Sequence, residues 1–141
     1  MINTSNTRKA MKIAFDAHID QVDKSGVPYI YHPIHLAEQM ETEDECIVAL
    51  LHDVVEDTKI TFEQLEKDFS SEIIDALKLL THNKNVDYIK YINNIKNNPI
   101  AKKVKLADLK HNSDITRLEK VTKKDEERRE KYRKAIEILN K

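Results

Sequence analysis

Cys46-Ile47-Val48-Ala49-Leu50-Leu51-His52-Asp53-Val54-Val55-Glu56-Asp57 is the stretch of sequence that decides the fold. Six consecutive apolar residues lead directly into a segment that carries one histidine and three carboxylates. The apolar run predicts a central helix, at about Glu43–Val55, that is buried on most of its sides. Burying a histidine beside carboxylates is costly unless a cation or strong hydrogen bonds compensate for it. We therefore expect the central helix to end at a polar site.

Outside this stretch, apolar residues recur with the 3.6-residue period of helices, and alternating β-branched runs are nearly absent. This pattern predicts an all-α protein, a compact bundle of seven to eight helices. The first helix is expected at about Thr7–Val22 and the last at about Lys123–Leu139. Capping residues and prolines place the starts of the others near Pro33, Glu43, Thr61, Ser71, Asp87 and Pro99.

Length and composition indicate one soluble globular domain over residues 1–141. The chain is 40% hydrophobic and 35% charged, and its formal net charge is −1. This balance gives no overall attraction to nucleic acid or to an anionic membrane. No secretory signal or membrane span is recognisable, so we expect a cytoplasmic protein. Whether it forms a homo-oligomer is left open.

The scarcity of cysteine and glycine limits the kinds of active site that the chain can form. Cys46 is the only cysteine, and its apolar neighbours favour a buried structural thiol over a reactive one. Gly26 is the only glycine, which excludes a glycine-rich phosphate-binding loop of the P-loop or dinucleotide type. Any phosphate chemistry must therefore use metal ions and side chains.

His52 and Asp53 are candidate metal ligands. Successive helical residues project about 100° apart, so this pair can flank one ion only with help from other elements. The candidate helpers are His32, which precedes Pro33, and Asp108, an acid between apolar residues. The alternative for Asp108 is a buried acid paired with a lysine such as Lys105 or Lys110.

Three motifs carry a family resemblance. They are Tyr29-Ile30-Tyr31-His32-Pro33, His52-Asp53-Val54-Val55-Glu56-Asp57-Thr58, and Lys105-Leu106-Ala107-Asp108 with His111-Asn112. With these motifs the chain resembles the HD-domain hydrolases, and specifically the hydrolase domain of the RelA/SpoT family, which removes the 3′-pyrophosphate from ppGpp and pppGpp. The resemblance extends from about Ala10 to Thr116. Because the chain ends at Lys141, we expect a free-standing small hydrolase rather than a long enzyme with synthetase and regulatory domains.

The resemblance implies an HD-domain fold and a metal-dependent phosphohydrolase acting on a nucleotide, with ppGpp as the first candidate. It implies one metal ion, typically Mn²⁺, that is held by His32, His52, Asp53 and Asp108. Glu56 and Asp57 would bind and orient the attacking water. Substrate contacts are expected at Lys24, Lys105 and Asn112.

Two departures from the family pattern concern substrate recognition. Asp23 stands where the family's ppGpp hydrolases have an arginine that stacks on guanine, and a carboxylate cannot replace a guanidinium there. Leu109 replaces the arginine that follows the metal aspartate, and Lys110 lies one position further on. The alternatives are therefore a phosphohydrolase of another nucleotide or phosphorylated metabolite, or a non-catalytic nucleotide-sensing module.

Three further residues are assigned more weakly. His18 has two interpretations: a residue that supports the site by a contact near it, or a simple core histidine. His111 is expected to form a structural hydrogen bond, and Tyr132 is expected to pack in the core rather than reach a pocket.

Overall fold

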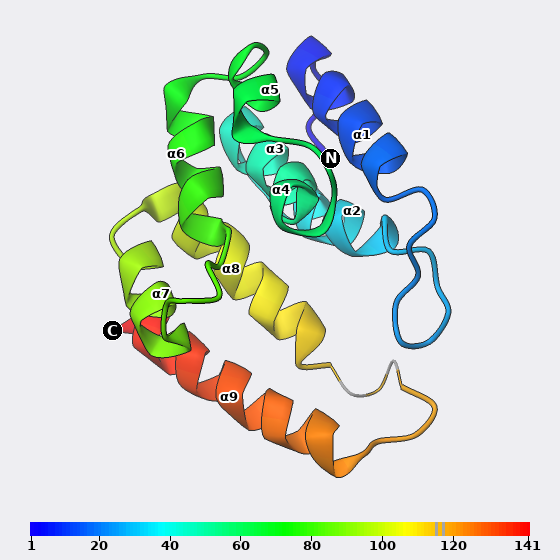
Figure 1. The fold of residues 1–141 in the computed structure, drawn as a ribbon, viewed down its shortest axis with the longest axis vertical. Helices are drawn as coiled ribbons and strands as arrows, with labels where there is room; N and C mark the ends of the chain where they lie inside the picture. Colours follow the sequence, from blue (N-terminus) through cyan, green and yellow to red (C-terminus); the bar gives the residue numbers. More distant parts are fainter. Residues whose placement is uncertain (115, 117) are drawn as a thin grey trace.

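A computed structural model describes residues 1–114, 116 and 118–141. Within these residues the only regular elements are helices, apart from one isolated bridge between Val22 and Pro28. The prediction of an all-α bundle is confirmed (Figure 1). The described helices are α1 (Ser5–Ala17), α2 (Tyr31–Glu38), α3 (Glu43–Leu51), α4 (Val54–Asp57), α5 (Phe62–Glu66), α6 (Ser71–Leu80), α7 (Tyr88–Ile95), α8 (Pro99–Asn112) and α9 (Lys123–Asn140).

Helix α3 is the core of the bundle. It packs against α1, α2, α6 and α8, and all six residues from Cys46 to Leu51 are buried, including the Cys46 thiol. Each fully buried Leu, Ile or Val contributes about 1.5–3 kcal/mol by removing apolar surface from water. The N-terminus of α3 is fixed by a capping box, in which Thr42 and Glu45 satisfy each other's backbone N–H groups. This burial fixes the C-terminal end of α3 in space.

The helix expected at about Glu43–Val55 is interrupted after Leu51. His52 is the C-cap of α3, and Asp53 takes a φ of −107° and a ψ of 0°, outside the α-helical range. The chain then re-forms a helix for a single turn, α4. The break changes the direction of the chain at Asp53, whereas His52 keeps α-helical dihedral angles.

Helix α8 supplies the second wall of the site. Asn98 caps its N-terminus, and Pro99 occupies the first turn, as the sequence predicts. Helix α8 contacts α3 on one side and α9 on another, and Lys103 of α8 binds Glu45 of α3 at 3.0 Å. The described helices include none that combines the length and apolar character needed to cross a bilayer.

Two helix boundaries differ from the sequence prediction. Helix α1 stops at Ala17 rather than near Val22, because the following residues turn into the loop that carries Gly26 at a φ of 80°. The N-cap of α6 is Ser70, not Ser71: the Ser70 hydroxyl accepts a hydrogen bond from the Ile73 backbone N–H. Both changes lie at helix ends and leave the bundle architecture intact.

Candidate metal centre and hydrolytic site

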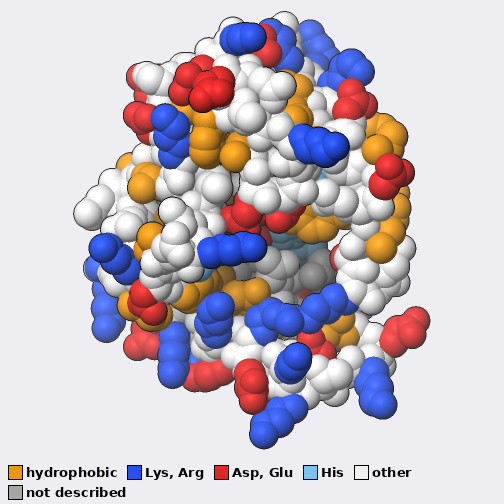
Figure 2. Space-filling model, viewed as in Figure 1, with side chains coloured by type: hydrophobic (Ala, Val, Ile, Leu, Met, Phe, Trp, Pro, Cys, Tyr) orange, Lys and Arg blue, Asp and Glu red, His pale blue; other side chains and the backbone are white. Residues whose placement is uncertain are grey.

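Four side chains from three helices and one interhelical junction meet beneath a hollow on the face shown in Figure 2. The candidate ligands are His32 of α2, His52 at the end of α3, Asp53 between α3 and α4, and Asp108 of α8. The first three each place a ligand atom within 4.8 Å of the others. Asp108 Oδ1 lies 2.9 Å from His32 Nε2 and 3.6 Å from His52 Nε2. The structure thus brings together the four residues that the sequence selects.

The imidazole of His52 shows how this cluster fits a cation. Its Nδ1 is 2.7 Å from the carbonyl oxygen of Ala49, which can only accept, so Nδ1 carries the hydrogen. The other nitrogen, Nε2, is buried and has no hydrogen-bond partner among the described residues. Its lone pair faces carboxylate oxygens, with Asp53 Oδ2 at 3.0 Å. A cation between these atoms would turn that repulsion into attraction.

The pKa shifts of the cluster indicate a strongly negative potential. Burial lowers the pKa of His52, but the negative charges of Asp53 and Asp108 raise it well above its usual value. Burial raises the pKa of Asp108, but the Lys105 charge and the two histidines bring it well below its usual value. Both directions favour positive charge beside ionised carboxylates. Two imidazole nitrogens and two carboxylates suit a divalent first-row metal ion.

Lys105 belongs to this cluster. Its ammonium lies 3.0 Å from Asp108 Oδ2, is largely buried, and sits 5.2 Å from the centre of the Tyr91 ring. The Asp108–Lys105 pair that the sequence offers as an alternative is therefore present. It coexists with the contact to the histidines, because Lys105 uses Oδ2 while His32 and His52 face Oδ1.

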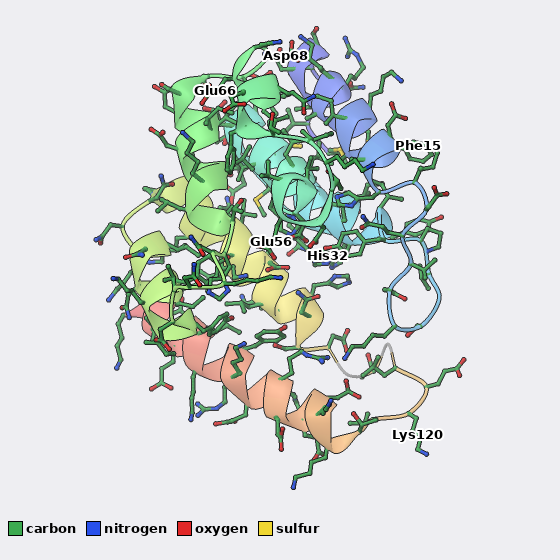
Figure 3. The ribbon with its side chains drawn as sticks, viewed as in Figure 1. Phe15, His32, Glu56, Glu66, Asp68 and Lys120 are labelled. Carbon is green, nitrogen blue, oxygen red and sulfur yellow. The ribbon has the colours of Figure 1, made fainter. Side chains whose placement is uncertain are left out.

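Glu56 and Asp57 lie on α4, next to the cluster. In the view of Figure 3, Glu56 lies between α4 and α8. Oε1 of Glu56 accepts a hydrogen bond of 2.8 Å from the backbone N–H of His82, which fixes the carboxylate. Partial burial, together with the charges of Asp53 and Glu56, raises the pKa of Asp57 to about 6.

A cavity of about 150 Å³ opens beside the cluster. Its wall includes His52, Asp53, Glu56 and Asp108, so a molecule within it can reach both the metal ligands and the α4 carboxylate. Such a volume holds several water-sized groups, which is enough for a phosphate group with its hydrating water. The arrangement can therefore bring a cation, a water molecule and a phosphate together.

A family model described as "HD domain" matches residues 10–139. The chain belongs to the HD-domain family. The guanosine-3′,5′-bis(diphosphate) 3′-pyrophosphohydrolase of Haemophilus influenzae is 45% identical over 75 residues, which cover 48% of this chain and 11% of the relative. A protein with the same description from Borreliella burgdorferi is 38% identical over 120 residues, covering 74% of this chain and 18% of the relative. The chain thus spans a small part of the curated relatives that it matches.

A solved structure supports the same HD-domain fold. It is described as "A metazoan ortholog of SpoT hydrolyzes ppGpp and plays a role in starvation responses". It aligns with a TM-score of 0.80 at 25% sequence identity, over 99% of this chain and 88% of the other. The HD-domain fold predicted from the three motifs is confirmed by this alignment and by the family model.

A second, larger cavity lies next to the first one in the HD domain. It measures about 370 Å³ and shares Asn112 and Tyr132 with the smaller cavity. Two predicted substrate contacts, Lys24 and Asn112, line it. Lys24 forms an ion pair with Asp125 of α9 at 2.9 Å, and the Asn112 amide donates to Asp108 Oδ1 at 3.0 Å. Tyr132 packs against the core, as expected, and it also lines both cavities.

The loop that contains Asp23 forms one wall of the larger cavity. Oδ1 of Asp23 accepts hydrogen bonds from the backbone N–H groups of Ser25, at 2.8 Å, and Val27, at 3.0 Å. The backbone N–H of Asp23 donates in turn to the Val27 carbonyl at 2.8 Å. Asp23 therefore folds its own loop, a task that an arginine at this position could not perform.

Three contacts surround the candidate ligands, and the sequence named the partner in none of them. The Tyr29 hydroxyl donates a short hydrogen bond to Asp53 Oδ2. The Nδ1 atoms of His32 and His111 are 2.7 Å apart, so His111 bonds directly to a candidate ligand. His18 is buried with its ring 4.9 Å from the Tyr29 ring, which favours the supporting position over a simple core position. Tyr29 lies in the first motif, and its place three residues before His32 was the available signal.

Proposed function

We propose that this HD domain is a Mn²⁺-dependent phosphohydrolase that acts on a nucleotide. We also propose that residues 1–141 form a single hydrolase domain that works in the cytoplasm. The observation that carries the proposal is the buried Nε2 of His52, which has no hydrogen-bond partner among the described residues and faces two carboxylates. The names of the relatives, which are ppGpp 3′-pyrophosphohydrolases, support a guanosine nucleotide as substrate.

In this proposal the metal ion is held by His32, His52, Asp53 and Asp108. Two imidazoles and two carboxylates suit Mn²⁺ and leave coordination positions for water and for a phosphate oxygen. When bound, the cation supplies Lewis-acid activation of water and of the phosphoryl group. Two hydrogen bonds orient the imidazoles: His52 Nδ1–H donates to the Ala49 carbonyl, and His32 shares a hydrogen bond with His111 through their Nδ1 atoms.

Glu56 and Asp57 are proposed to position the attacking water and to accept its proton. Glu56 lines the smaller cavity, and its Oε1 is held by the His82 N–H, which leaves Oε2 for the water. Asp57 follows Glu56 on α4 and offers a second carboxylate that can accept the proton. The water oxygen forms the new bond to phosphorus, the ester or anhydride oxygen leaves, and the proton passes to the carboxylate.

The substrate proposed first is ppGpp, from which 3′-pyrophosphate would be released. The cavity of about 370 Å³ has room for a nucleoside, with Lys24 and Asn112 as its contacts. Lys105 would act on the substrate indirectly, because its ammonium is bound to Asp108. The Asp23 loop favours the second candidate, hydrolysis of another nucleotide or phosphorylated metabolite, because its carboxylate cannot stack on a guanine.

The test is a substrate screen with purified protein and Mn²⁺. Hydrolysis of ppGpp and pppGpp, with release of diphosphate, is the expected result. The panel also contains NTPs, dNTPs and NMPs, and turnover of one of these without turnover of ppGpp would establish the second candidate. Binding of a nucleotide without turnover of any compound would contradict an enzymatic role and favour a nucleotide sensor. Protein without added metal is the control.

A further inference from the structure

One part of the wall of the smaller cavity is formed by α7 and α9. This part contains none of the proposed metal ligands. Tyr88 and Tyr91 of α7 and Lys131 and Tyr132 of α9 contribute to it. Both helices lie outside the three sequence motifs. Of these four residues, only Tyr132 carries an expectation from the sequence alone. Their polar atoms show what kind of group this part of the cavity can hold.

The hydroxyl of Tyr88 is buried and has no hydrogen-bond partner among the described residues. Its neighbour Tyr91, by contrast, donates to the Leu80 carbonyl at 2.6 Å. A buried hydroxyl without a hydrogen-bond partner is unfavourable, so a polar ligand that meets it gains a favourable contact. Burial raises the pKa of Tyr88 to about 12, so the hydroxyl remains protonated and can donate at neutral pH.

Lys131 lies over the ring of Tyr88. Its ammonium is 4.0 Å from the centre of the Tyr88 ring, and within the described part of the chain no carboxylate oxygen lies within 4.0 Å of it. The other lysine that lines the cavity, Lys105, is bound to Asp108 at 3.0 Å. Lys131 is therefore the cationic group of this wall whose charge is not already paired within the described residues.

The charges of the whole cavity depend on the metal ion. Asp53, Glu56 and Asp108 contribute three carboxylates, whereas Lys105 and Lys131 contribute two ammonium groups. Without a cation the carboxylates outnumber the ammonium groups of this wall, and a divalent ion adds positive charge that favours an anion. A hydrogen-bond donor and an unpaired ammonium beside such an ion form a site for a phosphate oxygen.

The sizes of the two cavities indicate which end of a nucleotide each of them can hold. The smaller cavity, about 150 Å³, accommodates a phosphate or diphosphate, whereas a nucleoside requires the neighbouring cavity of about 370 Å³. We propose that Tyr88 and Lys131 bind the phosphoryl end of the substrate, which becomes the inorganic phosphate or diphosphate product. This inference rests on the proposed phosphohydrolase function and adds to it the residues that hold the product.

The test measures binding of the product without requiring turnover. Binding of labelled inorganic phosphate and of labelled diphosphate is measured by equilibrium dialysis at a fixed free Mn²⁺ concentration. Tyr88→Phe is expected to raise the Kd of the preferred anion about tenfold, because one hydrogen bond to a charged group is lost. Lys131→Met is expected to raise it about three- to tenfold. Lys134→Met, which removes the same charge from an exposed position of α9, is the matched control and should retain wild-type affinity.

Two further readouts separate this role from a structural one. Tyr88→Phe should leave the Tm unchanged or raise it, because the hydroxyl has no partner to lose in the described structure. The Kd of Mn²⁺ measured without anion should remain that of the wild type in both variants. Anion affinities within twofold of wild type in both variants would overturn the inference, as would a marked fall in the Tm of Tyr88→Phe.

The outcome is distinguishable from failure of the proposed function. One result is that the wild type binds phosphate or diphosphate through Tyr88 and Lys131 and yet hydrolyses no nucleotide. That result would contradict the phosphohydrolase proposal and support the anion site. If the wild type hydrolyses a nucleotide but both variants bind the products with wild-type affinity, the phosphohydrolase proposal stands and the anion site is refuted.

Discussion

His32 Nε2 lies 2.9 Å from Asp108 Oδ1, although the two residues are 76 positions apart in the sequence. The contact joins α2 to α8, and His52 at the end of α3 approaches the same oxygen at 3.6 Å. Asp108 is therefore the point at which three helices of the bundle meet. It also binds Lys105 through its second oxygen, so it is held from both sides.

Asp108→Ala should abolish tight metal binding. The variant loses one of four proposed ligands, and we expect the Kd of Mn²⁺ to rise at least about 10–100-fold, as measured by calorimetry. Loss of the partner of Lys105 should also lower the free energy of unfolding by about 3 kcal/mol. Lys110→Ala, at an exposed position on the same helix, is the control and should bind Mn²⁺ normally. Wild-type Mn²⁺ affinity in Asp108→Ala would show that Asp108 is not a ligand.

Glu56→Gln should separate catalysis from metal binding. The amide oxygen can still accept the hydrogen bond from the His82 N–H, so the fold should be retained. Without a carboxylate to orient the water, we expect turnover to fall about 10²–10⁴-fold while Mn²⁺ affinity stays the same. The comparison is Glu63→Gln, an exposed residue of α5. If every activity of Glu56→Gln equals that of the wild type, the assigned role is wrong.

Asp57 should make the metal-free protein less stable as the pH rises. Its folded-state pKa, about 6, lies above its usual value of 3.8, so the folded protein binds the proton more tightly than the unfolded chain does. The resulting destabilisation is absent below about pH 3.8, develops between about pH 4 and 6, and is complete above that range. Because Asp57 is exposed, it should amount to no more than about 1 kcal/mol.

Asp57→Asn removes this destabilisation, so the variant should melt at a higher temperature than the wild type at pH 7.5 and at the same temperature at pH 4. Thermal melts in the presence of a chelator measure both values. A difference between the two proteins that is equal at both pH values would contradict the raised pKa.

Asp23→Ala should loosen the loop that borders the larger cavity. The substitution removes the acceptor of the Ser25 and Val27 N–H groups, and we expect a loss of about 1–2 kcal/mol in urea unfolding. Asp23→Asn keeps an Oδ1 acceptor and should retain most of the stability, which makes it the matched control. Equal losses in the two variants would mean that the charge, rather than the hydrogen bonds, stabilises the loop.

Local signals in the sequence predicted much of the fold. The Thr61–Gln64 capping box, the Asp87 cap and the start of α8 at Pro99 are all present in the structure. Each depends on residues within four positions of one another, so periodicity and capping rules are sufficient to find it. The burial of α3 was also predictable from local sequence, because six consecutive apolar residues leave a helix no polar face.

The remaining differences arise from contacts between distant residues. The interruption of the helix at Asp53 has no local signal, since Val54 and Val55 continue the apolar pattern. The contacts of Tyr29 with Asp53 and of His111 with His32 join separate elements, and neither pairing follows from spacing along the chain. Local propensity describes single helices, whereas these features depend on how helices pack together.

Helix α4 consists of four residues, too few to be stable as a helix in isolation. Its order therefore comes from contacts with the rest of the bundle: the buried terminus of α3 before it, the fully buried Val54 side chain, and the Glu56–His82 hydrogen bond that links it to the segment after α6. The proposed water-positioning carboxylate is consequently carried by a helix that cannot support itself, although this helix follows directly after the buried helix α3. Substitutions near His82, outside all three sequence motifs, should thus reach the reaction centre by releasing α4.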